Sequence, residues 1–128
     1  MALGCSTNSM LHLPAIAHEI GMDFDISFAN EISAKTPNLC HLAPAGPTYI
    51  EDLNEAGGVY AVMNELNKKG LLHTECMTVT GKTVGENIKD CVNLNPEVIR
   101  PSTIHTARQV DLQYLKVTLR PDGGVDKR

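Results

Sequence analysis

The sequence lacks an excess of positive charge and any long hydrophobic run. Its 128 residues carry a formal charge of −4, which provides no basic surface for nucleic acid or anionic lipid, so we expect neither as a partner. No apolar run approaches the roughly 18–20 residues needed to cross a bilayer, and no basic segment followed by a hydrophobic one opens the chain. These absences predict a cytoplasmic protein without a membrane segment.

Closely spaced cysteine pairs are also missing. The four cysteines are Cys5, Cys40, Cys76 and Cys91. They include no C-x-x-C pair and have no cluster of histidines near them, which excludes a zinc finger. The simplest interpretation is that they are small buried hydrophobic residues, with a disulfide or a metal role as the alternative. His41 follows Cys40, but neighbours in an extended segment point to opposite faces and are poorly placed to chelate. We therefore expect no metal site in this chain.

Apolar residues at three- and four-residue steps predict that the first 73 residues are mainly helical. Helices are expected over residues 9–20 and 26–34 and on both sides of Gly57-Gly58, with a proline-rich extended connector from residue 37 to 48. Pro14 predicts a kink or a helix start close to it. The residues expected to face inward are Met10, Leu13, Ala17 and Ile20, then Ile26, Ala29 and Ile32, and finally Val59, Val62, Met63 and Leu66.

From His73 onward the sequence changes character, and β-branched residues become frequent. Thr83 and Glu86 have the spacing of a capping box, which predicts a helical turn from residue 83 to 91. Alternation over residues 110–119 predicts a strand with a register break near 114–115, followed by a turn at residues 121–124. The expected fold class is α+β, with a boundary near residue 73.

Two short patterns resemble functional motifs but do not have the required spacing. Gly81-Lys82-Thr83 resembles the end of a phosphate-binding loop, yet Cys76 stands where the loop needs its first glycine, so we favour a capped turn over a nucleotide site. Glu51 and Asp52 are neighbours on a predicted helix and do not converge as a catalytic dyad must. His12 and His18 are six residues apart and cannot share a metal from one helix face.

Several longer stretches resemble the dihydroxy-acid/phosphogluconate dehydratase family. They are "MALGCSTNSMLHLPAIAHEIGMDFD", "NEISAKTPNLCHLAPAG", "EDLNEAGGVYAVMNELNKKGLLH" and "MTVTGKTVGENI" with "NPEVIRP". The resemblance runs from Met1 to about Pro101, and "TVTGKTVGEN" favours the dihydroxy-acid branch over the sugar-acid dehydratases. It implies that residues 1–73 are the end of the N-terminal, cluster-binding α/β domain. Residues 74–128 would begin the β-barrel-like C-terminal swivel domain, with residues 102–120 divergent because family glycines are replaced by Val110, Asp111 and Val117.

The resemblance also implies an activity. The family dehydrates 2,3-dihydroxy acids to 2-keto acids in branched-chain amino-acid biosynthesis, using an iron–sulfur cluster and magnesium. None of the four cysteines falls on a family ligand motif, and the T-D-G-R-x-S motif with its catalytic serine is absent from the sequence. We therefore expect a fragment of a hydro-lyase that holds no cofactor and is inactive alone.

Three alternatives accompany this interpretation. The chain could be a non-enzymatic module that associates, with itself or with a complementing piece, through uncovered apolar surface. It could belong to a sugar-acid dehydratase, or it could bind a nucleotide at residues 81–83. Ser6, Thr7 and Asn8 precede the first predicted helix, where they are expected to cap it or, in a complete family enzyme, to bind the substrate carboxylate.

Overall fold

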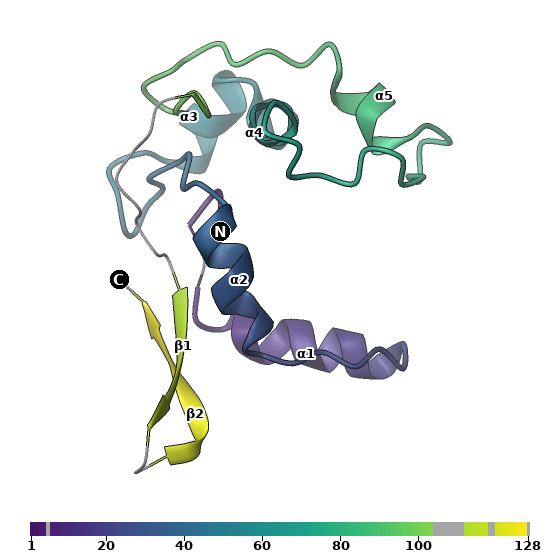
Figure 1. Cartoon of the computed structure of the whole chain (residues 1–128). Helices are drawn as coiled ribbons and strands as arrows, with labels where there is room; N and C mark the ends of the chain where they lie inside the picture. The colour runs from purple at the N-terminus through teal and green to yellow at the C-terminus, as the bar shows by residue number, and fades with distance from the viewer. Residues whose placement is uncertain (5, 104–111, 118–119, 128) are drawn as a thin grey trace. The chain divides into compact units, whose positions relative to one another are not determined.

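The computed structural model describes residues 1–4, 6–103, 112–117 and 120–127. In chain order the elements are α1 (Ser9–Glu19), α2 (Phe28–Lys35), α3 (Ile50–Glu55), α4 (Gly58–Asn67), α5 (Val84–Ile88), β1 (Leu112–Val117) and β2 (Arg120–Lys127) (Figure 1). The described part therefore contains several short helices and little strand, which confirms the mixed class in its coarse form. Met1, Leu3–Asn38 and the two strands form one compact unit, and Ala2 with the described part of residues 39–105 forms the other.

In the first unit, α1 packs against α2 through a small apolar cluster. Met10 and Ala29 are buried in it, and Met1 and Ile26 lie partly buried beside them. Ala17 of α1 is also buried, as predicted, but Leu13 is 48% and Ile20 69% exposed, so half of the predicted α1 stripe does not face inward. The helix begins at Ser9 and runs through Pro14, so it does not start near the proline.

The boundaries of α2 follow local signals in the sequence. The Asp25 carboxylate accepts a hydrogen bond from the Ser27 backbone N–H at 2.8 Å, just before the first helical residue. The helix ends at Lys35, and its C-cap Thr36 has an extended backbone before Pro37, so the Thr36-Pro37 pair ends the helix as predicted. Ser33 is buried together with Ala29, whereas Ile32 is 40% exposed and was wrongly assigned to the interior.

The strands β1 and β2 form an antiparallel pair that extends from Leu112–Lys127 to Val117–Arg120, and β1 lies next to α2 (Figure 1). The predicted strand is confirmed over residues 112–117, and its register shift lies between Leu115 and Val117. The predicted turn at residues 121–124 is wrong, because these residues belong to β2. Backbone pairing with β1 overrides the local turn signal. Val110 and Leu119 of the predicted strand lie outside the described residues.

In the second unit, α4 packs against both α3 and α5. Gly57 and Gly58 have φ values of +114° and +68°, which separate α3 from α4 as predicted. The buried apolar residues of this unit are Leu39, Cys40, Leu53, Ala56, Ala61, Val62, Ile88 and Ile99, together with Ala2. On α4 the buried face consists of Ala61, Val62 and Glu65, whereas Val59 is 51% exposed, so the predicted inward position of Val59 is wrong.

The remaining segments of the second unit agree with the local signals. Residues 38–48 contain no helix, and their pairing is an isolated bridge between Leu42 and Thr48. At α5 the expected capping box is present: the Thr83 N–H donates to the Glu86 carboxylate at 2.7 Å, and the Glu86 N–H donates to the Thr83 hydroxyl at 3.2 Å. The helix ends at Ile88, three residues before the predicted end at Cys91.

Candidate functional site

Ser6, Thr7 and Asn8 are all exposed and lie directly before α1. Asn8 occupies the N-cap position in an αR conformation, and its side chain makes no capping hydrogen bond. A capping side chain needs an extended backbone at this position, so the prediction that Asn8 caps the helix is wrong. Ser6 takes part in the turn instead, because its carbonyl accepts from the Ser9 hydroxyl at 2.6 Å and its hydroxyl accepts from the Asn8 N–H at 3.3 Å.

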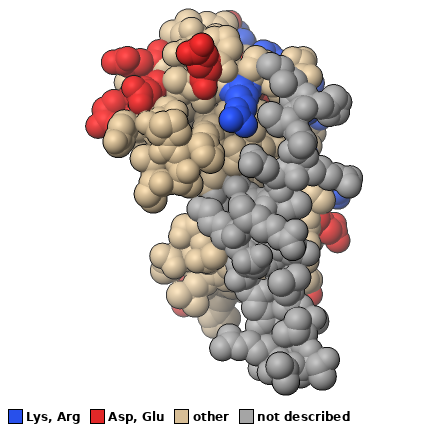
Figure 2. Space-filling model, turned by 90° about the vertical axis from the view of Figure 1, so that its left-hand side faces the viewer, with Lys and Arg blue, Asp and Glu red and all other residues tan. Residues whose placement is uncertain are grey.

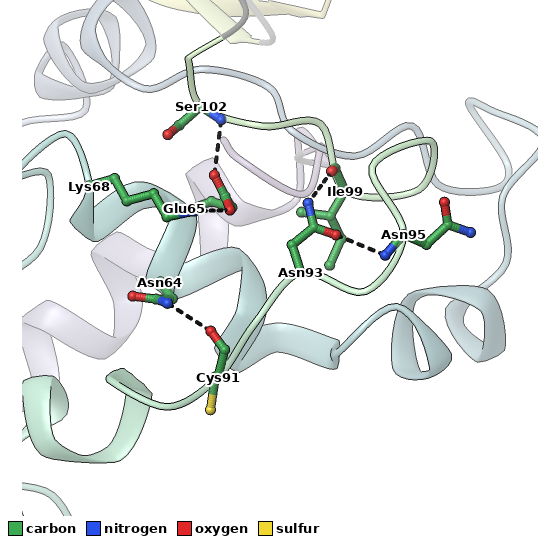
Figure 3. A network of polar contacts seen from close by, with 8 residues as sticks. All are labelled: Asn64, Glu65, Lys68, Cys91, Asn93, Asn95, Ile99 and Ser102. Carbon is green, nitrogen blue, oxygen red and sulfur yellow. Dashed lines mark hydrogen bonds and ion pairs between the residues drawn. The ribbon is translucent and has the colours of Figure 1, made fainter.

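A buried carboxylate on α4 is the main feature that sequence reasoning missed (Figure 3). The Glu65 side chain is 4% exposed, and its Oε1 lies 2.5 Å from Lys68 Nζ. Its Oε2 accepts a hydrogen bond from the Ser102 backbone N–H at 3.1 Å. Burial alone raises the pKa of Glu65, but the hydrogen bonds from Lys68 and Ser102 outweigh it, and the net pKa is lowered. Glu65 is therefore an ionised group that attaches the segment before residue 103 to α4.

Asparagine side chains hold the rest of this segment (Figure 3). Asn64 Nδ2 donates to the Cys91 carbonyl at 2.7 Å, and Asn93 Nδ2 donates to the Ile99 carbonyl at 2.6 Å. The Asn95 N–H donates to Asn93 Oδ1 at 3.1 Å. These side chains thus provide hydrogen-bond partners for the Cys91 and Ile99 carbonyls and for the Asn95 N–H. The network is structural: it fixes residues 91–102 against α4.

The "TGKT" stretch forms a tight turn before α5. The Thr78 N–H donates to the Lys82 carbonyl at 3.0 Å, and Gly81 provides the positive φ of +74° that the turn requires. Thr83 carries the cap of α5, which is five residues long. The bend at Gly81 and the cap at Thr83 are therefore confirmed, and they explain the motif without a nucleotide.

The described cysteines and histidines do not gather at one place. Cys40 is buried as predicted, and burial raises the pKa of its thiol to about 11, which disfavours the thiolate that metals bind. Cys76 is exposed, contrary to the prediction, and Cys91 is half-buried. Cys5 lies outside the described residues. Among the residues that the structure describes, no three histidine, cysteine or acidic side chains gather as a metal site would require.

The surface of the described residues offers neither a basic patch nor a deep cavity that would mark a second candidate site (Figure 2). On the face drawn in Figure 2, acidic residues gather at the upper left, and the basic residues lie singly toward the middle and right, so the described residues of that face form no basic patch. A shallow hollow of about 280 Å³ lies at the start of α4, lined by Asn54, Gly57, Gly58, Val59 and Tyr60. The Asp52 carboxylate accepts from the Tyr49 N–H at 2.8 Å, which places it at the start of α3. No helix in the described part of the chain is long and apolar enough to span a bilayer.

Comparison with known proteins gives a consistent result. The family described as Dihydroxy-acid/6-phosphogluconate dehydratase N-terminal matches residues 1–87. Proteins named dihydroxy-acid dehydratase from Agathobacter rectalis, Clostridium beijerinckii and Lachnoclostridium phytofermentans are 74%, 68% and 68% identical over all 128 residues. The similarity thus extends beyond Pro101 to the end of the chain, which spans 23% of the length of each of these relatives. The chain belongs to the dihydroxy-acid/6-phosphogluconate dehydratase family.

Proposed function

We propose that the chain is a structural part of a dihydroxy-acid dehydratase, a hydro-lyase that converts 2,3-dihydroxy acids to 2-keto acids in branched-chain amino-acid biosynthesis. The observation that carries this proposal is the 74% identity over all 128 residues to a protein of that name. The alternative, a part of a sugar-acid dehydratase, is supported by the family description, which covers both branches. The level of identity to the dihydroxy-acid branch favours the first.

We propose that this chain by itself does not turn over substrate. A cluster needs several thiolates that point to one place, and the described cysteines differ in burial and do not gather. The described residues therefore do not fit an iron–sulfur cluster, and we assign this cofactor and magnesium to other parts of a full-length family enzyme. We derive no step through either group.

An exchange experiment tests the assignment. In the chimera, the 128 residues of this chain replace the aligned 128 residues of the Agathobacter rectalis protein. After reconstitution with iron, sulfide and magnesium, we expect the chimera to form keto acid from a 2,3-dihydroxy acid and much more slowly from a sugar acid. The isolated chain, treated identically, should form none. Turnover by the isolated chain, or preference of the chimera for the sugar acid, would contradict the proposal.

We also propose that Ser6, Thr7 and Asn8 bind the substrate carboxylate in the complete enzyme. All three side chains are exposed, and they precede an 11-residue helix whose first N–H groups carry a partial positive charge. Asn8 is the best candidate, because its amide is not used as a cap. Charge-assisted hydrogen bonds of this kind contribute roughly 1.5–3 kcal/mol.

The substitution Asn8→Ala in the chimera tests this role. We expect KM to rise or kcat to fall by about tenfold or more, as the loss of one charge-assisted hydrogen bond predicts. The melting temperature should stay unchanged, because the Asn8 side chain makes no cap. Unchanged kinetics with a lower melting temperature would show that the stretch only supports the helix.

The domain assignment remains part of the proposal. We place residues 1–73 in the N-terminal domain of the complete enzyme and residues 74–128 at the start of its swivel domain, in a cytoplasmic protein. The divergence expected over residues 102–120 stays a prediction, since the identities are averages over the whole chain. As a second candidate function, exposed apolar residues on α1 and at its C-cap, including Ile16 at 61% and Ile20 at 69%, favour a module that associates through this region.

A further inference from the structure

The loop from residue 77 to 83 is closed by backbone hydrogen bonds. Met77 and Thr83 face each other in an antiparallel bridge. Between them, the Thr78 N–H donates to the Lys82 carbonyl at 3.0 Å and the Gly81 N–H donates to the Thr78 carbonyl at 3.1 Å. The loop therefore has a defined shape without any partner.

Side chains fix this shape further. Asn87 Nδ2 donates to the hydroxyls of Thr78 and Thr80 at 2.8 and 3.0 Å. The Thr80 hydroxyl donates to Asn87 Oδ1 at 3.1 Å, and the Thr78 hydroxyl donates to the Lys82 carbonyl at 2.8 Å. Asn87 lies on α5, whose capping box begins at Thr83. The loop is thus attached at two places to a capped helix, so ordering it costs nothing further on binding.

This rigid loop presents its apolar side chains to solvent. Val79, between the two bonded threonines, is fully exposed at 106%, and Met77 is 70% exposed. Thr78 and Thr80 both bond to Asn87, whereas Val79 between them makes its side chain fully available to solvent. A fully exposed valine on a rigid loop makes no contact that stabilises its own chain. It is suited instead to contact another polypeptide.

Resting on the proposed function, we propose that loop 77–83 is a plug that inserts Val79, with Met77 beside it, into an apolar recess of the dehydratase polypeptide outside this chain. About three quarters of the length of the relatives lies outside the aligned region, since the chain spans 23% of it. A second copy of the chain is a poorer occupant, because a stable dimer buries roughly 1,200 Å² or more and two side chains on a loop tip supply far less.

Thiol labelling of Val79→Cys tests the plug directly. The substitution is made in a Cys76→Ser background, both in the isolated chain and in the chimera with the Agathobacter rectalis protein. Alkylation at residue 79 is followed by mass spectrometry. In the native chimera we expect labelling at least about tenfold slower than in the same chimera unfolded in urea, because burial restricts access to the thiol. In the isolated chain the thiol should react at nearly the unfolded rate.

Equal labelling rates in the native and the unfolded chimera would overturn the proposal. If the isolated chain is labelled slowly and the labelling becomes faster on dilution, Val79 is buried against a second copy of the chain. That result would also contradict the proposal. Labelling measures burial and not turnover. A chimera that labels slowly but forms no keto acid would therefore count against the proposed activity while leaving the plug supported.

Discussion

Glu65 is a buried charged residue of the second unit, and its two partners differ in exposure. Lys68 is 54% exposed and can return to water, whereas the Ser102 N–H is buried and depends on the carboxylate. We expect Glu65→Ala to lower the free energy of unfolding by about 1–3 kcal/mol, the cost of leaving a buried donor unsatisfied. Chemical denaturation measures this. Lys69→Ala, next to Lys68 and exposed, is the matched control and should change little; equal effects of the two substitutions would refute the assignment.

The same residue predicts a pH dependence. The folded-state pKa of Glu65 lies below its ordinary value of 4.5, so the unfolded chain takes up this proton at a higher pH than the folded chain. The contribution of Glu65 is therefore complete above the ordinary value and is lost as the pH falls through the lowered folded value. Glu65→Gln should flatten this part of the stability curve. An identical acid slope in the variant would exclude Glu65 as its cause.

Glu65 was not predictable because glutamate on a helix is normally solvated. In the sequence it stands in "VMNELNKKG", where its spacing from Lys68 indicates only a surface ion pair. Its burial results from Ser102, 37 residues further on, whose N–H it accepts. Thr83 and Glu86 illustrate the opposite case: both partners of the capping box lie within one turn, so the sequence alone identified the contact.

At the scale of elements, the junction between α3 and α4 depends on two consecutive glycines with different surroundings. A Cβ on Gly57 would lie 2.6 Å from the Val92 carbonyl oxygen and 2.8 Å from Ala61 Cβ, whereas a Cβ on Gly58 would meet nothing within 4 Å. Both have positive φ, which costs a side chain about 1–2 kcal/mol. We expect Gly58→Ala to cost about that much and Gly57→Ala distinctly more, as thermal unfolding of both variants would show. Equal costs would mean that Val92 does not pack as described.

The helix ends were predictable because their signals are local. Gly57 and Gly58 permit positive φ values that other residues avoid, and Pro37 keeps Thr36 out of the helical conformation; both pairs mark boundaries in the structure. The buried faces were less predictable, since α1 and α4 carry apolar residues on more than one side. On α4 the small Ala61 is buried and Val59 is half-exposed. Which side of this helix is buried therefore depends on the neighbouring elements and not on the hydrophobicity of its residues alone. The same holds for the candidate site. The sequence predicted that Asn8 lies directly before α1, but it did not predict the αR backbone conformation of Asn8.

At the scale of the whole molecule, α1 leaves a continuous apolar stripe uncovered. Leu13 and Ile16 of α1 and its C-cap Ile20 follow one another at three- and four-residue steps and are 48%, 61% and 69% exposed, so they lie along one side of the helix. An exposed apolar stripe of this kind normally marks a surface that contacts another body. The stripe is therefore the surface through which we expect the isolated chain to associate.

The small size of this apolar stripe determines how strongly two copies can associate. Burying a leucine or isoleucine stabilises by about 1.5–3 kcal/mol when it starts fully exposed, and association costs roughly 4–15 kcal/mol in lost freedom. Three partly exposed residues on each copy give a weak dimer, so light scattering should show monomer at low and dimer at high concentration. Ile16→Lys should keep the chain monomeric throughout. His18 lies about 200° around the helix from Ile16, so His18→Lys should not prevent the dimer. A monomer at every concentration in the unsubstituted chain, or equal effects of both lysines, would show that this stripe does not mediate association.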